Sequence, residues 1–266
     1  MVPLTVNIDI DKKINISQSE RSISNKTDNS FFFGCGSYLI LDKNYRGNGL
    51  GMVLIQESLQ ILYDNGGLGS YFINTVSRCD NSIPLIKWIY PLNLDKLDSC
   101  HFVYPNNYRN RFEIGEKSEA IKVDEINIKE VYDFYIEYMK DKKVYFSPSL
   151  EYYRKWIKMY PTYILKDEKI EGLFSLRSNV IWYPTLRTNI NTGYCITCIG
   201  KNIDIVIKQV LYEAKKYFDV LIFYELGDVN SNNLNNIFAQ KNHKAYINFF
   251  NTTFKLDKSE FYAPPL

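Results

Sequence analysis

The chain has 266 residues and a mass of 31.3 kDa, and 45% of its residues are hydrophobic. This share of apolar side chains is sufficient for a packed core and excludes a wholly disordered chain. Lys and Arg total 32 against 30 Asp and Glu, so the net charge is +2, without the basic excess of a nucleic-acid-binding protein. We therefore expect no nucleic-acid partner.

The sequence shows no signal for export or for membrane insertion. No apolar run approaches the roughly 18 residues of a transmembrane helix. The first five residues, Met-Val-Pro-Leu-Thr, lack the basic and apolar parts of a signal peptide. The five cysteines are an odd number, which does not suit a framework of disulfides. These features predict a cytoplasmic protein with reduced thiols and no transmembrane segment.

Hydrophobic periodicity predicts the elements of the first half of the chain. In chain order they are a strand at 2–10, a buried strand at 31–41, a helix at 52–62, a strand at 71–76 and a helix at 82–88. The first helix places four apolar residues on one stripe: Met52, Ile55, Leu59 and Leu62. The second is predicted because Pro84 suits the first turn of a helix.

Residues 104–118 show no periodicity and predict a boundary between two domains, 1–118 and 119–266. After this boundary the strand and helix patterns restart. The predicted elements are strands at 120–123, 163–165, 171–176, 193–199, 220–224 and 245–254, and helices at 128–139, 149–156, 204–217 and 230–238. Helices and strands alternate in both halves, which predicts an α/β fold with a duplicated plan.

One pair of cysteines has the spacing of half a zinc site. Cys195-Ile196-Thr197-Cys198 lies in the predicted strand at 193–199, where residues three apart point to opposite faces. No second pair follows, so we interpret both cysteines as small core residues and predict no metal site.

A glycine-rich loop follows the strand at 31–41 and opens the helix at 52–62. Gly47, Gly49 and Gly51 allow the backbone to approach an anion, and the N–H groups at the start of a helix point toward such a ligand. Arg46 adds a permanent positive charge. The spacing fits neither a P-loop nor a dinucleotide-binding fingerprint. The alternative is a flexible surface turn.

Arg46-Gly47-Asn48-Gly49-Leu50-Gly51 resembles the pyrophosphate loop of the GNAT superfamily of coenzyme-A-dependent acyltransferases. Over most of its length the chain resembles one family of that superfamily, the protein N-myristoyltransferases. Short segments in the same order and spacing carry this resemblance: Arg46 with Leu50 and Val53-Leu54-Ile55, Lys87-Trp88, Leu92 to Leu97, Phe146-Ser147-Pro148, Phe218-Asp219-Val220 with Glu225-Leu226, and Phe249-Phe250-Asn251.

The resemblance implies a fold of two tandem GNAT-like halves around mixed β-sheets, without a prosthetic group or a metal. The first half would bind myristoyl-CoA as co-substrate, and the second would bind the N-terminal glycine peptides of target proteins. We expect a monomer. The implied site residues are Arg46, Gly47, Asn48, Gly49, Leu50 and Gly51 for acyl-CoA, Asn74, Tyr194 and Thr197 for substrate, the backbone N–H groups of Tyr38 and Leu39 as oxyanion hole, and the carboxylate of Leu266 as base.

The sequence departs from this family in ways that leave other functions open. The family's N-terminal segment is missing before Val2, Ser37 stands where the family has Asn, and glycines replace the basic residues that follow Arg46. One alternative is a catalytically inactive protein that binds acyl-CoA or a glycine peptide. The other is a GNAT N-acetyltransferase that uses acetyl-CoA.

Overall fold

The chain folds into two compact units, each built around strands that pair with one another. The computed structural model describes residues 2–8, 30–36, 42–65, 67–74, 80, 82–101, 118–142, 144–183, 187–235, 237, 239–250, 257–258 and 261–262. The first unit comprises Met1–Leu85, Met139–Pro148 and Ala245–Leu266, and the second comprises Ile86–Tyr138 and Ser149–Lys244. This division differs from the boundary expected at 104–118, because each unit takes segments from both sides of it.

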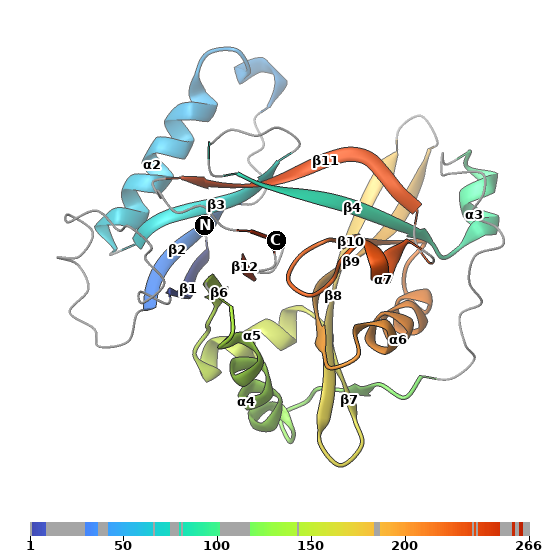
Figure 1. Cartoon of the computed structure of the whole chain (residues 1–266). Helices are drawn as coiled ribbons and strands as arrows, with labels where there is room; N and C mark the ends of the chain where they lie inside the picture. The colour runs from blue at the N-terminus through green and yellow to red at the C-terminus, as the bar shows by residue number, and fades with distance from the viewer. Residues whose placement is uncertain are drawn as a thin grey trace. The chain divides into compact units, whose positions relative to one another are not determined.

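The sheet of the first unit has the strand order β12-β6-β1-β2-β3-β11 (Figure 1). Its strands are β1 (Val2–Ile8), β2 (Ser30–Gly36), β3 (Gly67–Asn74), β6 (Val144–Phe146), β11 (Ala239–Phe250) and β12 (Phe261–Tyr262). β2 and β3 are parallel, β12 and β6 are parallel, and β1 is antiparallel to both β2 and β6. Consequently β2, β3, β6 and β12 all run in one direction, and their carboxyl ends lie at one edge of this sheet.

Helix α2 (Leu50–Asp64) connects the parallel strands β2 and β3, after the short 3-10 helix η2 (Lys43–Tyr45). Its C-terminal half packs on the sheet, where Leu62 is buried. A Cβ atom at Gly67 would lie 2.3 Å from Leu62 Cδ1, so only glycine fits at the start of β3. The predicted stripe is therefore correct at its C-terminal end and wrong at Met52, which is 60% exposed.

The sheet of the second unit has the order β4-β10-β9-β8-β7-β5. Its strands are β4 (Ile83–Pro91), β5 (Ile121–Lys122), β7 (Thr162–Lys166), β8 (Ile170–Tyr183), β9 (Thr188–Gly200) and β10 (Val220–Tyr224). β9 and β10 are parallel, joined by α6 (Ile203–Lys215), and the other pairings are antiparallel. The remaining helices are α3 (Leu94–Ser99), α4 (Ile128–Met139), α5 (Leu150–Met159) and α7 (Ser231–Leu234).

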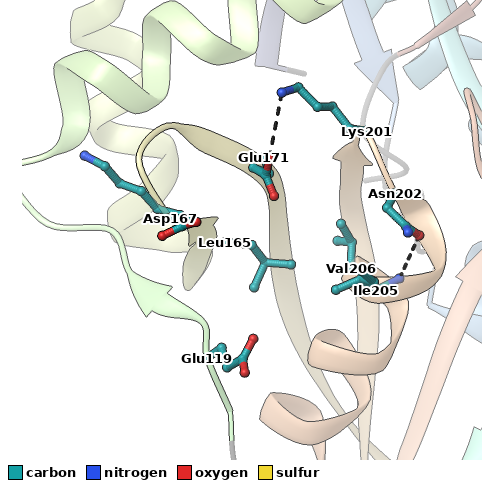
Figure 2. Close-up of a pocket in the computed structure, with 9 residues that line it drawn as sticks. Glu119, Leu165, Asp167, Glu171, Lys201, Asn202, Ile205 and Val206 are labelled. Carbon is teal, nitrogen blue, oxygen red and sulfur yellow. Dashed lines mark hydrogen bonds and ion pairs between the residues drawn. The ribbon is translucent and has the colours of Figure 1, made fainter.

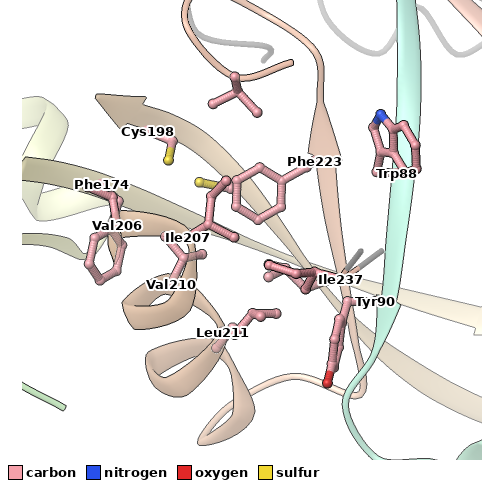
Figure 3. Close-up of a cluster of buried hydrophobic side chains, with 14 of the residues drawn as sticks. Trp88, Tyr90, Phe174, Cys198, Val206, Ile207, Val210, Leu211, Phe223 and Ile237 are labelled. Carbon is pink, nitrogen blue, oxygen red and sulfur yellow. The ribbon is translucent and has the colours of Figure 1, made fainter. Parts of the chain in front are cut away.

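The main core of the second unit lies between α6 and one face of its sheet (Figure 3). The inward stripe of α6 is almost fully buried: Val206, Ile207, Val210, Leu211 and Ala214. It packs against Phe174 and Phe223 from the strands, and Trp88 and Tyr90 of β4 complete the cluster. A smaller cluster on the opposite face contains Ile89, Leu97, Ile190, Val220 and Ile222. The predicted spacing of apolar residues in 204–217 is thus confirmed as a core face.

The predicted α/β fold with parallel and antiparallel strand pairs is confirmed, and several elements were predicted closely. The helix at 128–139 and the strand at 220–224 have the predicted bounds. The helix predicted at 82–88 is wrong: these residues belong to β4, in which Ile83 and Leu85 are buried around an exposed Pro84. A strand buries Ile83 and Leu85 on one face and leaves Pro84 exposed on the other, and this burial outweighed the preference of proline for the first turn of a helix. No helix of the described part of the chain is long and apolar enough to cross a membrane.

Candidate functional site

The glycine-rich loop of the first unit has a backbone that favours glycine. Asp42 caps η2, with its carboxylate accepting a hydrogen bond from Asn44 N at 2.9 Å. After η2, Gly47 (φ 88°) and Gly49 (φ 75°) both adopt the left-handed conformation. A Cβ atom at either position would meet no heavy atom within 4 Å, so conformation and not space selects glycine here.

Gly49 is also the N-cap of α2, and it has no side chain to occupy the end of the helix. Its carbonyl accepts from Met52 N at 2.9 Å and Val53 N at 3.2 Å, which begins the helical ladder. The N–H groups before this ladder have no acceptor within the helix, and the helix dipole makes this end positive. Residues 42–50 are all exposed. Arg46 to Gly51 therefore form a surface that suits an anion such as a phosphate.

An apolar surface adjoins this loop. Leu50, Met52, Val53 and Leu54, in the first turns of α2, are 38–60% exposed. Figure 1 shows the N-terminal end of α2 standing away from the strands of its own unit, which explains the exposure. A ligand with a phosphate and an apolar part would find both chemistries at this end of the helix.

The other predicted site residues of this unit occur at or after the carboxyl ends of its strands. Asn74 is the last residue of β3, and residues 37–41 follow the carboxyl end of β2. Tyr262 is 3% exposed and pairs with Tyr145, so the last strand is held in the same sheet. The carboxyl end of β12 lies at the edge at which β2 and β3 end. Tyr38, Leu39 and Leu266 themselves lie outside the described residues.

In the second unit a β-bulge sets the positions of Tyr194 and Thr197. Ser175 pairs with Thr197 and Leu176 pairs with Cys195, so Ile196 is an extra residue in β9. The extra residue shifts the alternation of side chains by one. Cys195 and Cys198 consequently join the same core cluster, and the prediction that they point to opposite faces is wrong. Burial raises the pKa of the Cys195 thiol well above its usual value.

The same bulge places Tyr194 and Thr197 together on the other face of the sheet. Thr197 lies opposite Ser175, whose hydroxyl is 2.9 Å from that of Thr162, so three neighbouring strands contribute a buried row of hydroxyl groups. The Lys87 ammonium lies 5.9 Å from the ring centre of Tyr194. This face therefore combines hydroxyl groups and a positive charge with the smaller apolar cluster, against which Tyr194 packs, and the structure brings the two predicted substrate residues onto it.

Two buried carboxylates, to which the sequence analysis gave no role, hold the second unit together. Asp219 accepts hydrogen bonds from Lys96 Nζ (2.5 Å), Asn93 Nδ2 (3.1 Å) and Asn191 N (2.8 Å). Glu225 accepts from the Trp88 indole (2.9 Å) and from the Ser231 hydroxyl. The sequence could have pointed to these two carboxylates, because Asp219 and Glu225 directly flank the apolar strand β10. Both join segments that carry the family resemblance.

A cavity of about 200 Å³ in the second unit contains none of the predicted site residues (Figure 2). It lies between the β7–β8 turn and the start of α6. Lys201 pairs with Glu171 at 3.8 Å, and Asn202 caps α6 by accepting from Ile205 N at 3.3 Å. These polar groups of the cavity thus stabilise the local fold through an ion pair and a helix cap. Among the described residues, no group of three His, Cys, Asp or Glu side chains is placed to hold a metal ion.

Comparison with known proteins relates this fold to solved structures. No family model matches the sequence. No curated protein sequence matches it either. Structures of N-myristoyltransferase from Saccharomyces cerevisiae with bound myristoyl-CoA superpose with TM-scores of 0.75 and 0.74 at 15% identity, covering 96% of this chain. A third, with bound myristoyl-CoA and inhibitors, has a TM-score of 0.73 at 14% identity.

The chain spans 63–66% of the length of these yeast proteins. Identity of 14–15% establishes likeness of fold. The resemblance inferred from short sequence segments is confirmed at that level: this chain has the fold of N-myristoyltransferase.

Proposed function

We propose that this protein transfers myristate from myristoyl-CoA to the N-terminal glycine amine of target proteins. The observation that carries the proposal is the common direction of β2, β3 and β12. Because of it, Asn74 and the carboxyl ends of β2 and β12, which precede residues 37–41 and 263–266 in the sequence, lie at one edge of one sheet. Ligands of open α/β sheets commonly bind at the carboxyl ends of parallel strands. The fold shared with N-myristoyltransferase supports the same conclusion.

The phosphate groups of the co-substrate bind at Arg46 to Gly51 in this proposal. Arg46 supplies charge, and the backbone N–H groups around Gly47 and Gly49 supply directional donors. The fourteen-carbon chain offers roughly 10 kcal/mol of gross transfer free energy at about 0.8 kcal/mol for each buried CH2 group. The exposed apolar turn at Leu50 to Leu54 suits contact with the apolar part of such a ligand.

The reaction needs a neutral amine, and the carboxylate of Leu266 acts as the base. An α-carboxyl group has a pKa of about 3.5 and an α-amine about 7.8, and loss of water narrows this gap because it disfavours both charged forms. The amine nitrogen attacks the thioester carbonyl and its proton passes to the carboxylate. The backbone N–H groups of Tyr38 and Leu39 donate to the oxyanion. Collapse of the intermediate releases the coenzyme A thiolate, which takes up the proton as the thiol.

The peptide binds, in this proposal, to the sheet face of the second unit that carries Tyr194 and Thr197. Tyr194, which is partly exposed, lies on it together with the buried Thr197, so Tyr194 is the member of the pair that a docking peptide would contact.

A transfer assay tests the proposal against its two alternatives. The purified chain is incubated with myristoyl-CoA and a Gly-initiated peptide, and the product is measured by mass. The controls are the same peptide with N-terminal Ala and with N-acetylated Gly, which should give no product. Stabilisation by myristoyl-CoA without product would identify a binding protein. Faster transfer from acetyl-CoA than from myristoyl-CoA would identify an acetyltransferase.

A further inference from the structure

Among the described strands, the distal part of the β8–β9 hairpin pairs only with itself. β7 pairs with β8 only as far as Ser175, and β10 pairs with β9 only from Thr192 onward. Beyond these points β8 and β9 continue to pair with each other up to Tyr183 and Thr188. In Figure 1 they are the long yellow and orange pair of strands. No other strand in the described part of the chain therefore pairs with either edge of this distal ribbon.

One face of this ribbon is packed and the other is open. Ile190 is fully buried in the smaller core cluster. Val180 and Trp182 alternate on the opposite face, which is the face that α6 covers farther along, and they are 57% and 54% exposed. Helix α6 does not reach them. Phe218, just after it, lies where a Cβ of Gly193 would be, and Asp219 N donates to Asn191 O, across the strand from Val180.

The end of α6 adds an aromatic ring and a positive charge beside this open face. Tyr217 is 59% exposed, and Lys215 is exposed in the last turn. Asp95 lines a pocket together with Lys215 and Tyr217, and two other acidic residues near the end of the helix are paired within the unit. Glu213 pairs with Lys216 at 2.8 Å, and Asp219 pairs with Lys96 at 2.5 Å.

The hairpin itself has only positive charge. From Gly172 to Gly200 the sequence contains no Asp or Glu, and its two charged residues are Arg177 and Arg187. Arg187 is exposed next to the ribbon and adopts a left-handed conformation (φ 49°). This local charge contrasts with the near balance of the whole chain.

We propose that this surface, Val180, Trp182, Tyr217, Lys215 and Arg187, docks on an anionic lipid bilayer. Trp and Tyr favour the boundary between headgroups and acyl chains, because one part of each ring is apolar and another is polar. Val180 adds aliphatic area, and Lys215 and Arg187 are attracted to anionic headgroups. An acidic protein or nucleic-acid partner would use the charge without needing the exposed aliphatic and indole groups. The surface is independent of acyl transfer.

The three tryptophans of the chain give a direct test. Trp88 and Trp156 are 3% and 4% exposed, so Trp182 alone should report contact with a membrane. The full chain is mixed with vesicles of phosphatidylcholine and phosphatidylserine at two to one, and with pure phosphatidylcholine vesicles. We expect a blue shift of fluorescence and co-flotation with the anionic vesicles only. Trp182→Ala and the double variant Lys215→Glu with Arg187→Glu should each bind about tenfold more weakly by flotation.

Matched surface variants control for unspecific effects. Met159→Ala removes an apolar side chain that is 64% exposed elsewhere in the same unit, and Lys122→Glu reverses a charge on the exposed strand β5. Both should bind vesicles like the wild type. Equal flotation of Trp182→Ala and wild type would overturn the proposal. Absence of flotation with the wild type, or Trp182-dependent binding to polyglutamate or duplex DNA in its place, would overturn it as well.

Discussion

The candidate sites of the two units differ in what they are made of. In the first unit the site consists of strand ends and of backbone N–H groups at Gly47 and Gly49. In the second it consists of side chains on the face of a sheet, Tyr194 and Thr197, set by a bulge. A site made of backbone N–H groups requires residues that can adopt its backbone conformation, and it places few other requirements on the side chains. The chain shares its fold with the yeast structures at only 15% identity, so few of their side chains recur in it.

The largest expected effect concerns the base in the first unit. Adding one glycine after Leu266 displaces the terminal carboxylate, and removing a general base typically lowers the rate by about 10²–10⁴-fold. We expect kcat to fall by that factor in the myristoyl transfer assay while myristoyl-CoA binding is retained. Leu266→Ala keeps the carboxylate and should stay near wild type. Unchanged kcat in the extended chain would show that another group is the base.

In the second unit, the largest expected loss of stability comes from removing the buried carboxylate of Asp219. Asp219→Ala leaves Lys96, Asn93 and Asn191 N without their acceptor, and we expect the free energy of unfolding to fall by about 3 kcal/mol. Urea unfolding measures this change. Asp133→Ala, which removes an exposed ion pair with Lys129, should cost less than about 1 kcal/mol. Equal losses for the two variants would refute a special role for burial at Asp219.

A substitution at Gly49 tests whether the first site depends on backbone conformation. Gly49→Val forces a β-branched residue into the left-handed region, at a cost of about 1–2 kcal/mol. We expect roughly tenfold weaker binding of myristoyl-CoA by calorimetry, because the loop relaxes away from this conformation. Gly49→Asn tolerates the same φ and should bind nearly normally. If Asn proves as harmful as Val, then something other than φ selects glycine.

The smallest expected effect is an alkaline loss of stability in the second unit. Burial raises the pKa of Tyr90 and of Tyr163 from 10.0 to about 12. The folded chain then keeps protons that the unfolded chain releases, so the free energy of unfolding is constant below about pH 10 and falls between about pH 10 and 12. Urea midpoints measured from pH 8 to 11 should show this slope. Tyr90→Phe should make the slope shallower, and an unchanged slope would exclude a contribution from Tyr90.

Local periodicity identified most of the elements that pack within one unit. The helix at 128–139 and the strand at 220–224 follow from spacing alone, because their burial is decided by their own apolar pattern. The helix predicted at 82–88 was wrong, because a proline suits both a helix start and an exposed strand position. The pairing of Lys87–Pro91 with β10 shows that this segment is a strand. The short strands β6 and β12 have too few residues to show a period at all.

The sequence by itself determined the α/β class, the loop from Arg46 to Gly51 and the resemblance to N-myristoyltransferase, since each depends on residues close together in the chain. Tertiary structure alone decided the common direction of β2, β3 and β12 and the bulge at Ile196. The physical reason is that strand direction and side-chain face depend on partners distant in sequence. A one-residue shift in pairing moved Cys198 to the core and left Thr197 beside Tyr194 on the opposite face.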